Sequence, residues 1–359
     1  MNKQKIKDIA IVTGGLGFIG SHLVDLLIDL NFKVIVLDNE STGRVSNLKE
    51  HLSNTNNNYK NYNNENLEII NVDISVLENI QKLYLSTRYP NIKYIFHLAG
   101  LADIVPSIER PLDYHNTNVN GTLNILTLAN DLRSKSTAFK KFVYAASSSC
   151  YGLSKDSSVE FRATREDDKI DPQYPYALSK NIGEQYVLHF GKIYKLPVVS
   201  LRLFNVFGTR SRTTGAYGAV LGIFLKQKLE KKPFTVVGDG NQCRDFIYVT
   251  DVASAFFAAA SSDVSNEVFN VGSGNTYSIN LLVELLAGEK IFLPKRPAEP
   301  DKTHADISKI KKMLNWRPQI TFEEGVGKVL QNIHYWQDAP LWDQHSIANA
   351  TANWFKHLS

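Results

Sequence analysis

A glycine-rich segment near the N-terminus constrains the fold of this chain more than any other feature. It reads TGGLGFIG and spans Thr13–Gly20. The run before it, Ile6–Thr13, is rich in Ile, Val and Ala, as buried parallel strands are. The run after it, Phe18–Asn31, has helical periodicity. A strand, a glycine turn and a helix in this order predict the first unit of a dinucleotide-binding domain.

The spacing of the glycines fits the same prediction. Glycine permits a tight turn, close approach of a pyrophosphate and close packing of helix on strand, and the helix N-terminus offers N–H groups to phosphates. An ordinary glycine-rich turn is the alternative. The segment satisfies both GxxGxxG and, through Gly15, GxGxxG; the residues that we expect at the cofactor are Gly14, Gly17, Phe18, Ile19 and Gly20.

An acidic residue follows at the end of the next apolar run, Lys33–Leu37. The carboxylate of Asp38 can hold the ribose hydroxyls of adenosine and would repel a 2′-phosphate, so we expect NAD rather than NADP. Arg44 is close enough in the sequence to leave NADP open. The alternative role of Asp38 is a simple cap at the strand end.

Two further strand ends are expected to lie against the cofactor. Leu67–Val72 ends at Asp73-Ile74, where a polar residue either lies beside the adenine or forms a turn. Asn91–Leu98 runs into Ala99-Gly100, whose small side chains let the backbone approach the nicotinamide ribose. His97 in this run is expected to be a packed core histidine rather than a ligand.

A tyrosine and a lysine are spaced for proton transfer. Tyr176 and Lys180 are four residues apart in the sequence, which puts both on one face of a helix. A phenol has an unperturbed pKa of about 10, and a cation within roughly 4–6 Å lowers that pKa by about 1–3 units. The pair suits a tyrosine that takes a proton from a sugar hydroxyl. By itself the same spacing describes an ordinary solvated helix face.

Hydroxyl and amide side chains complete this candidate site. The run Lys140–Ala146 is expected to be a strand that delivers Ser147 to the cleft as a donor to the reacting oxygen. A polar loop of three adjacent serines is the alternative. Asn118 lies in the helical stretch Asp113–Ser134, where it either braces the active-site helix or caps a kink at Gly121.

The order of the predicted elements indicates the fold class. Six strand-like runs separated by helices, the sixth at Pro197–Phe204, predict a Rossmann-type, doubly wound parallel α/β sheet, the NAD-binding domain at 1–204. After that the alternation breaks. Shorter elements, including Val268–Gly272, predict a smaller mixed α/β substrate lobe at 205–359, interleaved with the first domain. Within it, Trp342–Leu358 is an extra helix without an assigned role, whereas the Asn-rich Ser53–Asn66 is a surface insertion.

Composition excludes several other classes of protein. Apolar residues make up 43% of the chain and charged residues 21%, and the net charge of +4 is too small and dispersed for nucleic acid. Its best apolar run, Val252–Ser262, is too short to span a membrane, and the N-terminus has no signal-peptide core. The two cysteines, Cys150 and Cys243, argue against a disulfide framework and fit a reducing cytoplasm. We expect no metal site.

The motifs together are those of a known superfamily. They are Thr13–Gly20, Asp38-Asn39, Ala145–Gly152, Pro175–Lys180, Leu201–Gly208, Gly240–Val249 and Arg296–Asp306. From Ile6 to about Tyr335 the chain resembles the extended short-chain dehydrogenase/reductases and, within them, the UDP-sugar 4-epimerases. The resemblance implies NAD as cofactor, a nucleotide-sugar substrate and a homodimer paired through the helices Asp113–Ser134 and Tyr174–Tyr194.

The resemblance also implies roles for individual residues. Tyr176 is the base, Lys180 binds the nicotinamide ribose and Ser147 is the catalytic hydroxyl. Arg244 and Arg296 grip the diphosphate, although a plain ion pair with Asp245 and a solvated loop cation are their alternatives. Other cofactor positions are Asn39, Asp73, Ile74, Ala99 and Asn118, and other substrate positions are Ser148, Asn205, Ala219, Val220, Glu299 and Thr303.

Departures from related enzymes narrow the reaction. Family 4,6-dehydratases carry Asp-Glu directly after the catalytic threonine, and decarboxylases carry Glu at the second of these positions. This chain has Ser148 and Ser149, so no acid is present to drive elimination. Ala102 replaces the lysine of many glucose/galactose epimerases, and Thr303 replaces a bulky tyrosine near the C2 substituent of the sugar.

The resemblance therefore implies a C4 epimerase that accepts N-acetylated UDP-hexoses and acts through a 4-keto sugar. A dehydratase, decarboxylase or reductase on the same scaffold is the alternative enzyme. A nucleotide-sensing module that keeps the fold without the chemistry is the alternative of another class. For the dimer interface we expect an apolar stripe that includes Leu123, Leu126, Val187 and Leu188.

Overall fold

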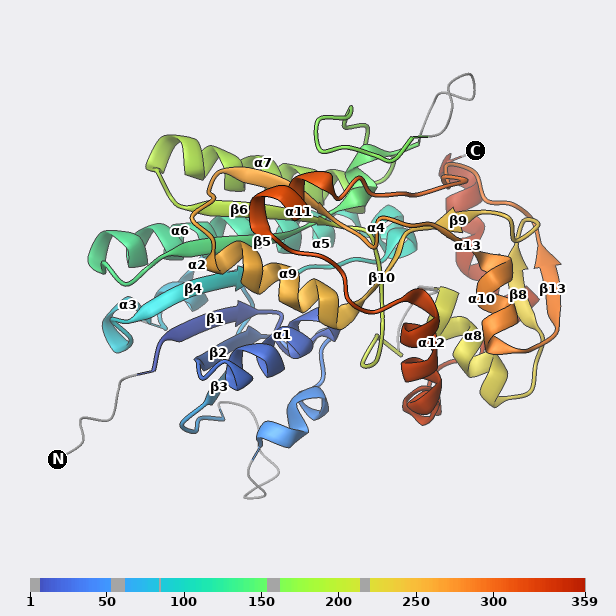
Figure 1. Cartoon of the computed structure of the whole chain (residues 1–359), viewed down its shortest axis with the longest axis horizontal. Coiled ribbons are helices and arrows are strands. Elements are labelled where there is room, and N and C mark those ends of the chain that lie inside the picture. The colour runs from blue at the N-terminus through green and yellow to red at the C-terminus, as the bar shows by residue number, and fades with distance from the viewer. Residues whose placement is uncertain (1–6, 53–61, 84, 154–161, 214–219, 359) are drawn as a thin grey trace.

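A computed structural model of the chain describes residues 7–52, 62–83, 85–153, 162–213 and 220–358. Its centre is a seven-stranded parallel sheet with the strand order β11-β6-β5-β4-β1-β2-β3 (Figure 1). The strands are β1 (Ile9–Thr13), β2 (Lys33–Asp38), β3 (Leu67–Asn71), β4 (Ile92–His97), β5 (Lys141–Ser147), β6 (Val198–Leu203) and β11 (Glu267–Val271).

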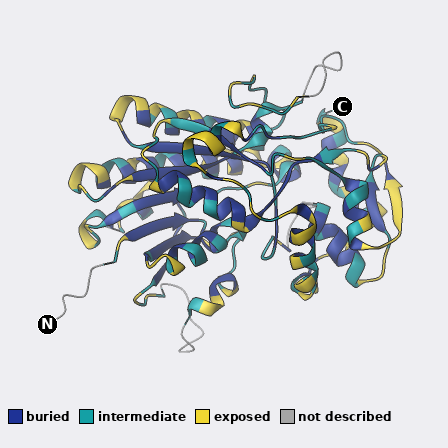
Figure 2. Ribbon diagram, in the orientation of Figure 1, coloured by how far each residue is buried: buried dark blue, intermediate teal, exposed yellow. Residues whose placement is uncertain are grey.

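Helices cover both faces of the sheet. One face packs against α1 (Phe18–Asp29) and α9 (Val249–Ser261), whose Leu23 and Phe256 belong to the same buried cluster. The other packs against α6 (Gly121–Lys135) and α7 (Pro175–Tyr194), with α2 (Leu77–Gln81) and α3 (Leu85–Arg88) beside α6. Figure 2 shows the strands buried between these layers. Because each strand is covered on both faces, the strands are nearly continuous apolar runs.

The direction of the chain changes at β1. From there the chain runs outward to β2 and β3, and β4 then returns to the other side of β1. Open parallel sheets bind ligands beyond the carboxyl ends of the strands at such a switch point. The glycine segment and the strand ends predicted at the cofactor all lie at this edge.

A smaller group of elements forms a third buried cluster around Phe224, Phe322 and Trp336. Its strands pair in twos, β8 (Phe234–Val237) with β13 (Lys290–Leu293), β7 (Asn205–Phe207) with β10 (Phe246–Tyr248), and β9 (Cys243–Arg244) with β12 (Tyr277–Ser278). Its helices are α8 (Val220–Leu229), α10 (Ile279–Leu286), α12 (Phe322–Gln331) and α13 (Gln344–Leu358). The α11 helix (Ser308–Leu314) instead packs on the main sheet through Ile310.

The predicted fold class is confirmed, with differences in two elements. The sheet has a seventh strand, β11, in the run that we assigned to the smaller lobe. This strand pairs with β6 and forms one edge of the sheet. The long helix predicted at Asp113–Ser134 is divided into α5 (Pro111–His115), a π-helical turn at Asn116–Asn120 and α6. The centre of the Asn-rich insertion, 53–61, lies outside the described residues.

Two expected absences can be compared with the described residues. No helix there combines the length and apolarity needed to cross a membrane. No group of three or more His, Cys, Asp or Glu side chains in that part of the chain is arranged to hold a metal ion.

Candidate active site

The glycine segment forms a close-packed turn between β1 and α1. A Cβ on Gly14 would lie 2.7 Å from the amide nitrogen of Ala99, and a Cβ on Gly20 would lie 2.1 Å from the carbonyl oxygen of Gly14. Gly14 also has a φ of +70°, which favours glycine. Gly17 is the N-cap of α1 and offers no side-chain cap, so the first N–H groups of the helix stay available to an anion. The turn fits a pyrophosphate.

Asp38 ends β2 beside this turn. Its carboxylate accepts hydrogen bonds from the backbone N–H of Leu16 at 3.0 Å and of Glu40 at 2.8 Å. Burial raises the pKa of Asp38, and these hydrogen bonds oppose that shift. Arg44 is directed elsewhere, because it donates to Thr213 Oγ1 at 2.5 Å and its guanidinium lies 5.9 Å from the Tyr335 ring centroid.

Asn39 and Asp73 line one cavity of about 450 Å³ at the ends of β2 and β3. Asp73 also accepts hydrogen bonds from the N–H and the hydroxyl of Ser75, so it does form a turn. Ile74 is buried next to it. The amide of Ala99, at the end of β4, donates to Thr13 Oγ1 at 3.1 Å. His97 is fully buried between Thr13 and Thr122, which confirms its expected core position.

Ser147 and Tyr176 meet at the carboxyl edge of the sheet. Ser147 ends β5, Tyr176 is the second residue of α7, and their side chains are hydrogen-bonded. Ser147 Oγ also lies 2.8 Å from Ser149 Oγ and accepts from the Ser149 N–H at 3.2 Å. The three serines therefore form a hydrogen-bonded turn, with Ser148 half-buried between its neighbours. This turn holds the Ser147 hydroxyl against the phenol.

The electrostatics of the pair differ from the expectation. Burial raises the pKa of Tyr176 rather than lowering it, and the hydrogen bond from Ser147 opposes the shift. The Lys180 ammonium lies 4.4 Å from the ring centroid of Tyr144. Lys180 is 6% exposed, and burial lowers its own pKa to about 7. The predicted lowering of the Tyr176 pKa by Lys180 is wrong for the protein alone, because desolvation outweighs other effects at both groups.

Asn118 lies in the π-helical turn and braces α7. Its amide nitrogen donates to Ser179 Oγ at 2.9 Å and to the carbonyl oxygen of Leu101 at 3.0 Å. Its oxygen accepts the Leu101 N–H at 2.8 Å. Of the two roles considered from the sequence, the structure has the brace, which ties α7 to the loop after β4.

Three of the residues predicted at the substrate form a charged cluster among the elements that follow β6. Arg244 is buried and donates to Glu299 at 2.8 Å, and Arg296 lies 3.7 Å from the second oxygen of the same carboxylate. Arg244 is thus paired with Glu299 and not with Asp245. Thr303 Oγ1 donates to Asn205 Oδ1 at 3.0 Å. Val220 begins α8, whereas Ala219 lies outside the described residues.

The sequence reasoning missed a buried network behind the site. Glu184, one turn after Lys180 on α7, accepts from Arg202 at 2.6 Å and from Ser200 Oγ at 2.8 Å. Arg202 also donates to the Tyr151 hydroxyl at 2.8 Å, and Tyr151 donates to Asn270 at 2.6 Å. An arginine inside the apolar run of β6 was the available signal, because a buried cation requires partners.

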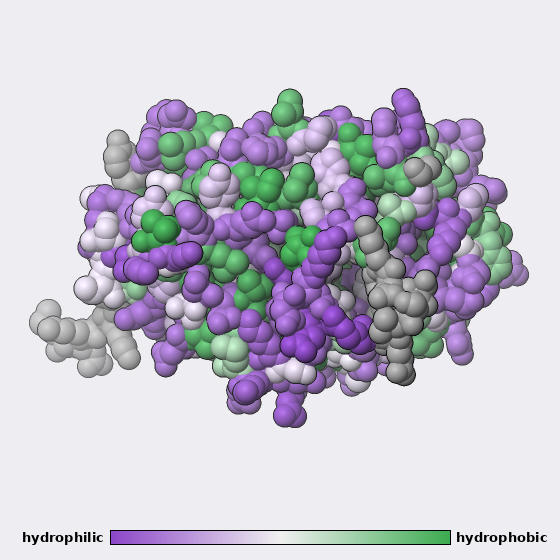
Figure 3. Space-filling view, turned by 90° about the horizontal axis from the view of Figure 1, so that it is seen from above, coloured by the Kyte–Doolittle hydropathy of each residue, from purple (hydrophilic) through white to green (hydrophobic). Residues whose placement is uncertain are grey.

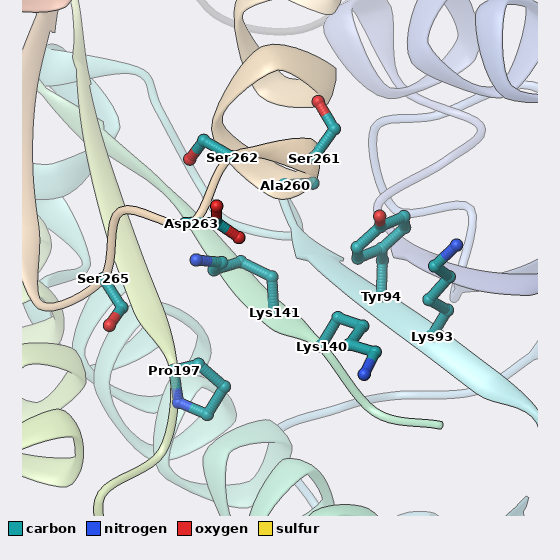
Figure 4. A pocket seen from close by; sticks show the side chains of 10 residues that line it. All are labelled: Lys93, Tyr94, Lys140, Lys141, Pro197, Ala260, Ser261, Ser262, Asp263 and Ser265. Atoms are coloured by element: carbon teal, nitrogen blue, oxygen red, sulfur yellow. The ribbon is translucent and has the colours of Figure 1, made fainter. Parts of the chain in front are cut away.

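A cavity of about 360 Å³ lies at the other end of the strands, where β4, β5 and β6 begin (Figure 4). Three lysines line it, but Lys93 pairs with Asp8 at 2.8 Å and Lys141 donates to the carbonyl oxygen of Val264. The Lys141 side chain points toward Asp263 in Figure 4. With two of its three cations so paired, this cavity is not a candidate for the reaction.

Comparisons with known proteins agree with this geometry. A model of the NAD dependent epimerase/dehydratase family matches residues 10–272. A putative UDP-glucose 4-epimerase of Methanocaldococcus jannaschii is 34% identical over 327 residues, which cover 89% of this chain and 96% of the relative.

Two solved structures are similar in both sequence and fold. A UDP-N-acetylglucosamine 4-epimerase from Methanobrevibacter ruminantium, in complex with UDP-N-acetylmuramic acid, is 33% identical; the match has a TM-score of 0.76 and covers 91% of this chain and 100% of that one. A UDP-glucuronic acid 4-epimerase from Bacillus cereus, in complex with UDP-glucuronic acid and NAD, is 29% identical; the match has a TM-score of 0.75 and covers 90% and 98% of the two chains.

Proposed function

Since the chain belongs to the NAD dependent epimerase/dehydratase family, we propose that it inverts C4 of a UDP-hexose, N-acetylated sugars included. The cofactor is NAD. One observation carries the proposal: Ser147 and Tyr176 are hydrogen-bonded where β5 ends and α7 begins, while the two positions after Ser147 carry hydroxyls and no acid. That set can move a proton at C4 but has no group placed to expel a C6 hydroxyl.

The residues present fit NAD. The turn at Gly14 and Gly20 leaves no space for a side chain, and the uncapped start of α1 faces the same turn. Asp38 would hold the adenosine ribose, and Arg44, bonded to Thr213, leaves the ribose end without a dedicated 2′-phosphate partner among these residues. When bound, NAD supplies a hydride acceptor and, once reduced, a hydride donor.

Tyr176 is the proposed base and Ser147 its partner. As a phenolate, Tyr176 takes the proton of the C4 hydroxyl and, as a phenol, returns it after the 4-keto sugar has presented its other face. Ser147 donates a hydrogen bond to the reacting oxygen in both directions. Burial raises the pKa of Tyr176. Formation of the phenolate near neutral pH therefore requires a positive charge close to it. Lys180, next to Gly100 and over Tyr144, orients the nicotinamide ribose.

The charged cluster is the proposed diphosphate site. Arg244 and Arg296 share Glu299 in the structure and would turn toward the diphosphate, while Glu299 would hold the uridine ribose. Arginine suits this task because its planar guanidinium binds phosphate oxygens in pairs. Asn205, Ser148, Val220 and Thr303 would line the rest of the pocket. On this proposal residues 1–204 bind NAD and supply Ser147, Ser148 and Tyr176 to the sugar, and residues 205–359 supply the rest of the nucleotide-sugar site.

We also propose a homodimer through α6 and α7. Of the four positions first expected at the interface, Leu126 and Val187 are fully buried in the core beneath these helices and cannot reach a partner. Leu178 and Ile193 on α7 are 48% and 54% exposed and take their place. The view from above in Figure 3 shows apolar groups scattered among polar ones.

Turnover of nucleotide sugars without added NAD tests the function. The purified protein is incubated with UDP-glucose and with UDP-N-acetylglucosamine, and the products are separated. C4 epimers without net NADH support the proposal. A C6-deoxy product or loss of carbon dioxide from a uronic acid would replace it with the alternative enzymes, and binding without turnover would replace it with a sensing module.

A further inference from the structure

The C-terminal helix α13 lies beyond the residues that the family model matches, yet it packs beside the candidate diphosphate site. Its Trp354 is 4% exposed, and the guanidinium of Arg296 lies 5.5 Å from the centroid of the Trp354 ring. The indole N–H donates to the carbonyl oxygen of Pro297 at 2.8 Å. One side chain thus contacts Arg296 and anchors the residue next to it.

The same ring reaches toward the catalytic tyrosine. The Trp354 and Tyr174 ring centroids are 6.5 Å apart, and the Tyr174 ring lies nearly parallel to that of Tyr176, at 9° and 6.4 Å. Tyr174 is the N-cap residue of α7 and lies two positions before Tyr176. The neighbouring residue Asn353 donates to Glu109 of α4 (Ile104–Glu109) at 3.0 Å, and α13 and α4 are in contact.

We propose that Trp354 is a positioning residue for nucleotide-sugar binding, which holds Arg296 by its aromatic face. The inference rests on the proposed function, because it takes Arg296 to be a diphosphate ligand. A cation is attracted to the face of an indole ring, and more strongly where water is excluded. An arginine already held in place loses less side-chain freedom when the diphosphate arrives.

The charge arrangement favours this role over simple packing. The interactions of Arg296 in the structure include a carboxylate at 3.7 Å and the indole face. Glu299 is shared with Arg244, which lies closer to it at 2.8 Å. When Glu299 turns to a ribose, the ring still holds Arg296, because an aromatic face does not compete for the phosphate oxygens.

A matched pair of substitutions tests the proposal. Trp354→Phe keeps an aromatic face, whereas Trp354→Leu keeps apolar volume without one. Asn353→Ala on the same helix removes the contact with Glu109 and is the control. Affinities for UDP and, separately, for NAD are measured by calorimetry, with the melting temperature of each variant. If Trp354→Leu does not fold, Trp354→Met supplies the non-aromatic member.

We expect Trp354→Leu to weaken UDP binding about three- to thirtyfold, Trp354→Phe to restore most of it, and Asn353→Ala to leave it near wild type. NAD affinity should be unchanged throughout. The double variant Trp354→Leu/Arg296→Gln should bind UDP only slightly more weakly than Arg296→Gln alone, because both substitutions remove the same Arg296–Trp354 contact. Equal UDP affinities for the Phe and Leu variants, additive effects with Arg296→Gln, or parallel loss of NAD binding would overturn the inference.

The outcomes separate this inference from the proposed function. UDP binding by the wild type without a difference between the Phe and Leu variants sinks the inference alone. A wild type that binds no UDP removes the substrate class and the inference together. Turnover enters neither comparison.

Discussion

The hydroxyl of Thr303 donates a 3.0 Å hydrogen bond to Asn205 Oδ1 and accepts one of 3.1 Å from the backbone N–H of Asp245. Thr303 is half-buried, and these two bonds hold its side chain in place. On the proposed function it lies at the C2 substituent of the sugar, where a tyrosine would take up more volume.

Thr303→Tyr should lower kcat/KM for UDP-N-acetylglucosamine at least tenfold more than for UDP-glucose. A packed pocket rejects even small overlaps at roughly 1–3 kcal/mol, and an N-acetyl group adds three heavy atoms. The measurement is the ratio of kcat/KM for the two sugars. Thr303→Val, which removes the hydroxyl at constant size, is the control and should leave that ratio near wild type. Wild type that turns over only UDP-glucose and UDP-galactose contradicts the argument.

Tyr176→Phe should lower kcat by about 10²–10⁴-fold, the usual effect of removing a general base. Only the phenolic oxygen is lost, so the fold and NAD affinity should stay as in the wild type. Single-turnover rates and NAD titration check the two parts separately. A variant with a near-normal rate removes Tyr176 from the mechanism.

Lys180 should make stability depend on pH. The unfolded chain holds its proton up to about pH 10.5 and the folded chain only to about pH 7. Between these values the unfolded state binds more protons, so the contribution of Lys180 to the free energy of unfolding increases as the pH rises. Below pH 7 Lys180 is charged in both states, and its burial destabilises the fold most. Lys180→Met should therefore gain more melting temperature over the wild type at pH 6 than at pH 9. An equal difference at both pH values would show that the ammonium is solvated.

The proposed dimer should depend on exposed apolar residues of α7. Leu178 and Ile193 are 48% and 54% exposed. The double variant Leu178→Glu/Ile193→Glu places charge in the proposed interface and should be monomeric at micromolar concentration. Phe292→Glu, at a 55% exposed position on β13 in the smaller group of elements, serves as a control. Light scattering measures the mass of each. A wild type that is monomeric over the same concentrations refutes the dimer.

Much of the fold could be predicted because it depends on local patterns. The apolar runs that became β1 to β6 and the glycine turn between Thr13 and Gly20 are short-range signals, and each is where it was expected within a few residues. The edge strand β11 was missed as part of the sheet because it joins β6 from more than sixty residues away. Pairing at that range has no local signature.

The candidate site was predictable in its members but not in its charges. Ser147 and Tyr176 meet as their motifs imply, yet the pKa of Tyr176 follows burial, which a spacing of four residues does not reveal. The partners of Arg202 and of Arg296 come from distant segments, Glu184 in one case and Trp354 in the other. Such contacts depend on tertiary packing that no motif describes.

On the proposed function, the C4 hydrogen leaves the sugar as hydride and returns to the same carbon. UDP-hexose carrying deuterium at C4, chosen from the sugars that the wild type turns over, tests it most directly. We expect an epimerised product that keeps deuterium at C4, in ordinary water and without accumulation of NADH. Deuterium lost from C4, or recovered at C6 of a deoxy product, would contradict it.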